Sequence, residues 1–276
     1  MAEIIIAGIG QTAVGEHWDE SLRTLAGQAI QAAIQDSGGL RPQALYVSNM
    51  LAPSLSRQTH LGTLLADCAG LRQDDPVLRT GIEAVTVEAG GASGGAALRQ
   101  GYLAVASGMV DVALVAGVEK FTDVIGPEQE AALATVADAD YESIHGLTLT
   151  AQAALIARRY MHENQVPADG LAGFPLTAHA NGAGNKNAMY RKPVAMEAYQ
   201  QAEPVCDPLN IYDIAPNADG AAAVILTAAN CFRRIFPTRS SDWRLRPSLP
   251  THSPYRSAGI LYGSQPRRRP SRKPSR

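Results

Sequence analysis

Strand-like and helical segments alternate through the first 120 residues, and this alternation is the feature that most restricts how the chain can fold. Short apolar, β-branched runs are typical of buried strands, and the longer segments between them carry apolar residues at helical spacing. The expected strands are residues 3–8, 44–49, 83–89 and 111–119. The expected helices are residues 21–39, 59–71 and 93–108. Regular alternation of this kind indicates an α/β fold built on an open sheet of parallel strands.

The pattern changes between residues 120 and 205, which we interpret as a mostly helical insertion on the α/β core. Residues 146–165 have an amphipathic helical pattern, and residues 170–188 form a second helical segment that ends in an Asn- and Gly-rich loop. Strand character returns in AAAVILT, residues 221–227, after the turn-rich APNADG. The sequence therefore predicts one α/β domain over residues 1–230 that is interrupted by a helical segment.

The composition changes abruptly near residue 230. Residues 231–276 contain 12 of the 24 Lys and Arg residues but only one of the 26 acidic residues, so their net charge is near +11 while that of residues 1–230 is near −13. Eleven Arg, eight Ser and seven Pro with few apolar residues predict a disordered tail. A reading-frame shift near codon 230 would produce the same switch, and a genuinely divergent tail is the alternative. Clustered Arg can bind nucleic acid, but no recognised module accompanies it, so nucleic acid is not an expected partner.

The sequence also disfavours several classes of protein. No apolar run approaches the roughly 18 residues of a membrane span, and the amino terminus lacks the basic region of a signal peptide, which favours a cytoplasmic protein. The three cysteines form no CxxC pair, so neither a disulfide framework nor a metal site is expected. Cys68 falls on the apolar side of an expected helix and is predicted to be a buried structural thiol. Acidic neighbours make Cys206 a poor nucleophile. No GxGxxG follows the first strand, so a dinucleotide site is unsupported.

The stretch VEAGGASGGAALRQG, residues 87–101, leads from an expected strand through small residues directly into an expected helix. The amino end of a helix lowers the pKa of a thiol and stabilises an oxyanion, so a nucleophile placed there is both activated and exposed. GASGG, residues 91–95, satisfies the G-x-S-x-G pattern of a hydrolase nucleophile with Ser93 at its centre. Asp140 and His145 are the available triad partners, although their close spacing is unusual. The competing interpretation makes Ser93 a helix N-cap.

Three segments carry a resemblance to a known family. Residues 87–120 resemble the nucleophile segment of thiolases, especially the sterol-carrier-protein type, residues 179–193 (HANGAGNKNAMYRKP) are similar to part of that family's loop domain, and residues 216–226 (PNADGAAAVIL) resemble the segment that closes its first half. The segments occur in the family's order, and the resemblance covers residues 1–230. It implies the first half of a layered αβαβα fold, with a helical loop domain at about residues 120–205.

The resemblance also implies a function. Thiolases bind acyl-CoA in a groove roofed by the loop domain and carry out a Claisen condensation or the thiolytic cleavage of a 3-ketoacyl-CoA. Aligned on the family pattern, Gly91 occupies the position of the nucleophilic Cys, and glycine has no side chain that could carry an acyl group. The expected contacts to the substrate or to CoA are Ser93, His179, Lys186 and Arg191. Coenzyme A thioester is expected as substrate, with no bound cofactor and no metal.

The chain departs from the family pattern a second time, because none of the second-half His and Cys motifs follows residue 230. We therefore expect a thiolase-like C-acyltransferase relative that lacks the covalent mechanism. Two alternatives remain open: a non-catalytic acyl-CoA-binding subunit of a larger complex, and an acyl-CoA aldolase that needs a general base but no acyl-enzyme. Loss of the second half would expose an apolar face, so a homodimer, a higher oligomer or a partner subunit is expected.

Overall fold

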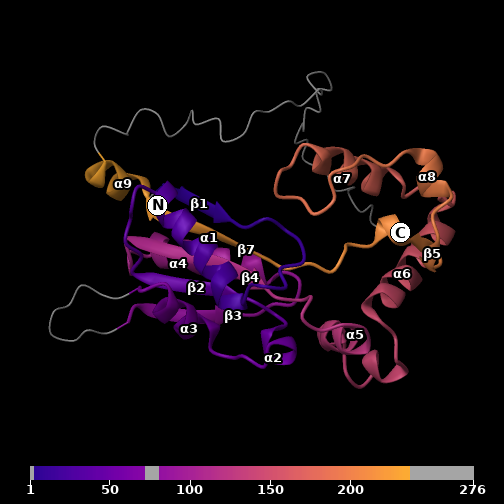
Figure 1. Ribbon diagram of the computed structural model, residues 1–276, viewed down its shortest axis with the longest axis horizontal. Coiled ribbons are helices and arrows are strands. Elements are labelled where there is room, and N and C mark those ends of the chain that lie inside the picture. Colours follow the sequence, from indigo (N-terminus) through magenta and orange to yellow (C-terminus); the bar gives the residue numbers. More distant parts are fainter. Residues whose placement is uncertain (1–2, 72–80, 237–276) are drawn as a thin grey trace, which may run out of the picture. The chain divides into compact units, whose positions relative to one another are not determined.

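The computed structural model describes residues 3–71 and 81–236, and it shows a five-stranded sheet with helices on both faces (Figure 1). A mostly helical segment, called here the loop domain, is inserted before the last strand of this sheet. The described residues up to Ile235 belong to one compact unit. The strands of the main sheet are β1 (Ile4–Gln11), β2 (Ala44–Ser48), β3 (Glu83–Val87), β4 (Val112–Glu119) and β7 (Gly220–Ala228). The helices of the core are α1 (Leu22–Asp36), α2 (Ala52–Leu55), α3 (Leu61–Cys68), α4 (Ser93–Ala106) and α9 (Ala229–Ile235).

The sheet is mixed, with the strand order β1-β7-β4-β2-β3. β2 pairs in parallel with both β3 and β4, whereas β7 is antiparallel to both of its neighbours, β1 and β4. The four strands that the sequence predicts in the first 120 residues therefore run parallel to one another, as expected. β7 runs the other way because the chain returns from the loop domain at the carboxyl edge of the sheet and inserts between β1 and β4.

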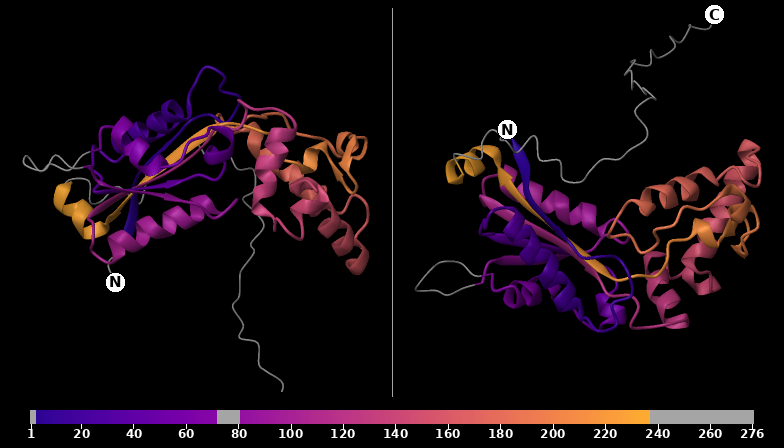
Figure 2. Two further views of the ribbon diagram at one scale, coloured as in Figure 1. Left: turned by 90° about the horizontal axis from the view of Figure 1, so that it is seen from below. Right: turned by 45° about the horizontal axis from the view of Figure 1, so that its top comes forward.

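Helices cover the two faces of the sheet unequally. α1 and α3 lie on one face and α4 lies on the other (Figure 2). α1 approaches β1 closely because two glycines face it: a Cβ added to Gly8 would lie 2.3 Å from the carbonyl oxygen of Ala33, and one added to Gly10 would lie 2.2 Å from that of Ala29. Any larger residue would push the helix away from the sheet.

α4 rests on the opposite face of the sheet through its small residues. Ala97 and Ala104 are buried there, and a Cβ added to Gly101 would lie 2.5 Å from the Cγ2 atom of Val115. The outer side of the same helix carries exposed apolar side chains, which are Leu98, Tyr102 and Leu103 at 40%, 43% and 41% exposure. The described part of the chain thus covers α4 on one side only.

The loop domain contains the two helices that the sequence predicts, as α6 (Leu149–Asn164) and α7 (Gly173–Ala183). Thr148 caps α6, since its side chain accepts a hydrogen bond of 3.1 Å from the amide of Ala151. The remaining regular elements of this domain are the helices α5 (Pro127–Leu133) and α8 (Met196–Gln200), the hairpin strands β5 (Pro204–Cys206) and β6 (Leu209–Asn210), and the short 3₁₀ turns η1 (Ala134–Val136), η2 (Ser143–His145) and η3 (Ile211–Asp213). The sequence does not predict the hairpin.

After β7, the helix α9 continues to Ile235, so the first residues beyond position 230 are helical. The prediction of a disordered tail at residues 231–276 is therefore wrong for residues 231–235, and from residue 237 onward it lies outside the described residues. Within residues 3–71 and 81–236, no helix has both the length and the apolar character that crossing a membrane requires.

Candidate functional site

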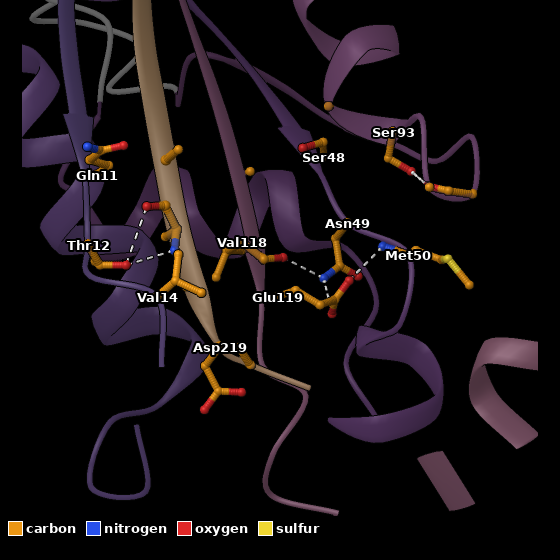
Figure 3. A pocket seen from close by; sticks show the side chains of 18 residues that line it. Gln11, Thr12, Val14, Ser48, Asn49, Met50, Ser93, Val118, Glu119 and Asp219 are labelled. Atoms are coloured by element: carbon orange, nitrogen blue, oxygen red, sulfur yellow. Dashed lines mark hydrogen bonds between the residues drawn. The ribbon is translucent and has the colours of Figure 1, made fainter. Parts of the chain in front are cut away.

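A pocket of about 490 Å³ opens at the edge of the sheet where β1, β2 and β4 end and β7 begins (Figure 3). Carboxyl ends of parallel strands are the usual place for a ligand in open α/β sheets. The side chains that give the pocket its polar character are those of Gln11, Thr12, Ser48, Asn49, Ser93, Glu119 and Asp219. Its remaining wall includes the glycines Gly90, Gly91, Gly94, Gly117 and Gly220.

Gly91 lies in this pocket wall, just before α4. Its backbone φ lies outside the left-handed region, and a Cβ added to it would meet no heavy atom within 4 Å, whereas Gly90 has φ = +55°. The N-cap of α4 is Ala92, which makes no side-chain hydrogen bond, so no side chain caps the positive end of the helix. A helix amino terminus that no side chain caps favours a negatively charged group nearby. The position that the family resemblance gives to the nucleophile thus has both the space and the electrostatic setting for one.

Ser93 is the first residue of α4 rather than its N-cap, which corrects the N-cap interpretation. Its hydroxyl accepts a hydrogen bond of 2.9 Å from the amide of Ala89 and donates one of 2.7 Å to the carbonyl of Gly90. Both bonds close the turn that leads into the helix. Among the described residues, no hydrogen bond joins this hydroxyl to Asp140 or His145, which lie in the loop domain. The hydroxyl therefore has a structural role in this turn and lacks the partners of a hydrolase nucleophile.

Glu119, at the end of β4, is an ionisable group in the pocket wall. Its carboxylate accepts hydrogen bonds from the side-chain amide of Asn49 at 2.8 Å and from the backbone amide of Met50 at 3.2 Å (Figure 3). The backbone amide of Leu51 donates a further one at 3.2 Å. Burial raises the pKa of Glu119 above its ordinary value, although these hydrogen bonds favour the charged form. The group is thus fixed in place, and its raised pKa makes it a better proton acceptor than an ordinary glutamate.

Asp219 lines the pocket but is locked in an ion pair with Lys120, with 2.8 Å between Oδ2 and Nζ. Burial alone would raise the pKa of Asp219, but hydrogen bonds from Lys120, Thr122 and the amide of His17 outweigh it and hold the pKa well below its ordinary value. Asp219 therefore stays ionised and is a poor proton acceptor compared with Glu119.

Of the four residues that the sequence proposes for substrate or CoA contacts, Ser93 lines the pocket, whereas His179, Lys186 and Arg191 do not. They lie in the loop domain, where the ring of His179 stacks on Tyr190 at 6.4 Å and meets Tyr212 edge-on at 5.7 Å. Lys186 and Arg191 are exposed on the segment that follows α7. This segment contacts the core through a 2.9 Å hydrogen bond from the amide of Val14 to the carbonyl of Asn187.

The cysteines lie apart from the pocket, and the prediction for one of them is wrong. Cys68 is exposed, because it is the last residue of α3 and the buried face of that helix is formed by Leu61, Gly62, Leu65 and Ala66. Cys206 is half-buried in β5, and Cys231 is buried in α9. Among the described residues, no group of three or more His, Cys, Asp and Glu side chains is placed to hold a metal ion.

Sequence reasoning missed Asn49, Glu119 and the Lys120–Asp219 pair. Glu119 and Lys120 end one of the segments that carry the family resemblance, and Asp219 lies within another. The available signal was a pair of charged residues directly after an apolar strand, where parallel strands end. That signal alone does not reveal which charge faces the pocket and which is paired.

Comparison with known proteins identifies the family. A model of the thiolase N-terminal domain matches residues 4–230. An acetyl-CoA acetyltransferase of Methanothermobacter thermautotrophicus is 40% identical over 240 residues, which are 86% of this chain and 60% of the relative. A second acetyl-CoA acetyltransferase, from Methanocaldococcus jannaschii, is 37% identical over 83% of this chain and 56% of the relative. The chain thus spans little more than half the length of these curated relatives.

Solved structures agree with this assignment. The Ltp2-ChsH2(DUF35) aldolase superposes with a TM-score of 0.63 at 26% identity, and the match covers 83% of this chain and 56% of the aldolase chain. Human mitochondrial 3-ketoacyl-CoA thiolase, solved in complex with CoA, superposes with a TM-score of 0.66 at 16% identity over 85% of this chain and 66% of its own, which supports the fold alone. The helix–sheet–helix arrangement of the described core matches the N-terminal half of these proteins, as the sequence predicted. The chain belongs to the thiolase family and contains its N-terminal domain.

Proposed function

We propose that this chain binds coenzyme A thioesters at the pocket beside Gly91 and that, without a thiol at this position, it forms no acyl-enzyme by itself. The observation that carries the proposal is the pocket wall at Gly91, where an uncapped helix end and open space surround a residue that has no side chain. The pocket volume of about 490 Å³ is in the range of small-molecule sites. The names of the two acetyl-CoA acetyltransferase relatives support the ligand class.

The loop domain would contribute to the same ligand through its charged segment. Lys186 and Arg191 are exposed cations on the segment after α7. The carbonyl of Asn187 in this segment accepts a hydrogen bond from Val14 of the β1–α1 connection, which lines the pocket. Phosphate groups pair well with such side chains, Arg in particular through two parallel hydrogen bonds. The adenosine phosphates of CoA would bind here while the thioester enters the pocket.

Calorimetric titration with acetyl-CoA, followed by intact-protein mass spectrometry, tests this proposal. Saturable binding without a protein-bound acetyl group is expected, and Lys186→Ala should weaken binding several-fold. Arg159→Ala is the matched control, because Arg159 is exposed on α6 and, within the described part of the chain, forms its ion pair with Glu163. Absence of binding, or a stoichiometric acetyl adduct on the unaltered chain, would contradict the proposal.

A second candidate function is aldol cleavage of an acyl-CoA side chain, which needs a base but no nucleophilic thiol. The similarity to the Ltp2-ChsH2(DUF35) aldolase favours it. Glu119 would be the base, since it is the pocket-lining carboxylate whose pKa is raised and Asp219 is held in its ion pair. Release of an aldehyde or ketone from a 3-hydroxyacyl-CoA by the unaltered chain, abolished by Glu119→Gln, would favour this function over simple binding.

A partner chain is part of the proposal. The outer side of α4 exposes Leu98, Tyr102 and Leu103, and contiguous apolar surface of this kind marks association sites. We expect this side to be covered by a second copy of the chain or by a partner subunit. Analytical ultracentrifugation should show an oligomer that Tyr102→Glu weakens, and a stable monomer that binds acetyl-CoA with full affinity would contradict the need for a partner.

A further inference from the structure

A buried ion pair joins the two points at which the loop domain is attached to the core. Lys120 directly follows β4, where the chain leaves the sheet for the loop domain, and Asp219 directly precedes β7, where the chain returns. The two residues are 2% and 1% exposed, and they are 99 positions apart in the sequence. A buried, mutually paired charge is costly to separate, so this pair fixes the two attachment points to each other.

Asp219 also holds the connection between β1 and α1. Besides the Lys120 ammonium, its carboxylate accepts hydrogen bonds from the amide of His17 at 3.0 Å and from the amides of Phe121 and Thr122 at 2.6 and 2.9 Å. The hydroxyl of Thr122 donates a further one at 2.7 Å. The backbone of Asp219 exchanges two hydrogen bonds with Gly15, at 2.8 and 3.2 Å. One carboxylate therefore joins three chain segments.

Residues 12–18, which Asp219 holds, contact both parts of the proposed ligand site, namely the pocket and the charged segment of the loop domain. Thr12 and Val14 line the pocket, and the ring of Trp18 lies 5.9 Å from Nζ of Lys120. The amide of Val14 donates to the carbonyl of Asn187, the residue next to Lys186. Residues 12–18 thus form a strut between the buried pair and the charged segment of the loop domain.

We propose that Asp219 is a positioning residue: its carboxylate fixes the strut at residues 12–18, and through the strut it fixes the charged segment at residues 185–191 relative to the pocket. Asp219 itself contacts no ligand in this role. The part of the proposal that concerns ligand affinity rests on the proposed binding of CoA thioesters, whereas the ordering of the two segments does not depend on any ligand.

The test is hydrogen–deuterium exchange of the full chain, measured by mass spectrometry. Asp219→Asn alone removes the buried partner of Lys120 and leaves it the exposed Asp123, and a buried charge that has lost its buried partner can unfold the chain. The double variant Asp219→Asn/Lys120→Met removes both charges at similar volume, which a folded core tolerates better. Asp207→Asn is the matched control, because it breaks the exposed ion pair between Asp207 and Arg158.

In the double variant, exchange should become at least about tenfold faster in residues 12–20 and 185–191 and stay unchanged in β2 and β4. The control should leave residues 12–20 unchanged. Unchanged exchange in both segments, or a uniform increase that includes β2 and β4, would overturn the proposal, since the latter is what a purely stabilising pair would give.

Affinity for acetyl-CoA supplies the second readout. The double variant should weaken binding about tenfold, and Lys186→Ala should have little additional effect in that background, because non-additivity shows that both changes act on one contact. If the losses of binding free energy in the two variants add fully, Asp219 does not act through the charged segment, and the proposal is contradicted. If the unaltered chain binds no acetyl-CoA, the proposed function fails while the exchange experiment still decides the positioning role.

Discussion

Introducing a thiol by Gly91→Cys tests whether the amino end of α4 still provides the setting that a nucleophile needs. The added Cβ meets no heavy atom within 4 Å, and φ of Gly91 lies outside the left-handed region that L-residues rarely adopt. Replacing glycine at such a position restricts the unfolded chain, so the free energy of unfolding should stay unchanged or rise by up to about 1 kcal/mol. The structure would then have room for a side chain at this position, and the site would lack a nucleophile only because residue 91 is a glycine.

The expected reactivity follows from the position of the introduced thiol, two residues before the start of α4. A helix amino terminus stabilises a negative charge by about 0.3–1 kcal/mol, and 1.36 kcal/mol corresponds to one pKa unit. The pKa of the introduced thiol should therefore lie about 0.2–0.7 below that of a thiol introduced by Gly27→Cys, also in open space but inside α1.

The assay is the pH dependence of alkylation by iodoacetamide, followed at the modified peptide by mass spectrometry so that the native cysteines do not interfere. The difference between the two variants should shrink in 1 M salt, because screening weakens the attraction of the helix end for the thiolate. A thiol at position 91 that titrates at or above the one at position 27 would refute the reasoning. It would mean that the carboxylates of Glu88 and Glu119 outweigh the helix end at this site.

Three further predictions concern stability. Because the pKa of Asp219 is held below its ordinary value and that of Lys120 is raised, the stability they contribute should be constant near neutral pH, be lost as the pH falls below about 4, and be lost again as it rises above about 10. Urea unfolding across this range should show both slopes in the unaltered chain and smaller ones in Asp219→Asn/Lys120→Met, and equal slopes in the two chains would contradict the assignment. Gly10→Ala should lower the free energy of unfolding by about 1–3 kcal/mol because the methyl group meets α1, whereas Gly27→Ala, in open space, should not lower it. Equal midpoints in urea would count against this packing. Thr148→Ala should lower the free energy of unfolding by about 1 kcal/mol because it removes the cap of α6, and Thr148→Ser should lower it much less. Thermal unfolding measures both, and equal losses in the two variants would argue against the cap.

The sequence by itself determined the elements of the core and the family. Strand and helix periodicity is a local property, since it records which side of each element faces the core, and the predicted elements of residues 3–119 are present. The assignment of Gly91 to the nucleophile position rests on the family resemblance, and the open space around this residue is known only from the structure. Cys68 shows the limit of such local reasoning: the apolar pattern of α3 placed it inside, but the helix ends there and the thiol is exposed.

Only the tertiary structure decided how distant segments meet. The insertion of β7 between β1 and β4 joins segments more than 100 residues apart, and nothing in the local pattern of either one specifies its partner or direction. The same holds for the pocket, where Glu119 is held by the loop after β2. It also holds for Asp219, whose five hydrogen-bond donors come from two distant segments, at residue 17 and at residues 120–122. Hydrogen bonds and ion pairs between segments depend on which side chains the folded backbone brings within about 3 Å, and sequence spacing carries no record of that distance.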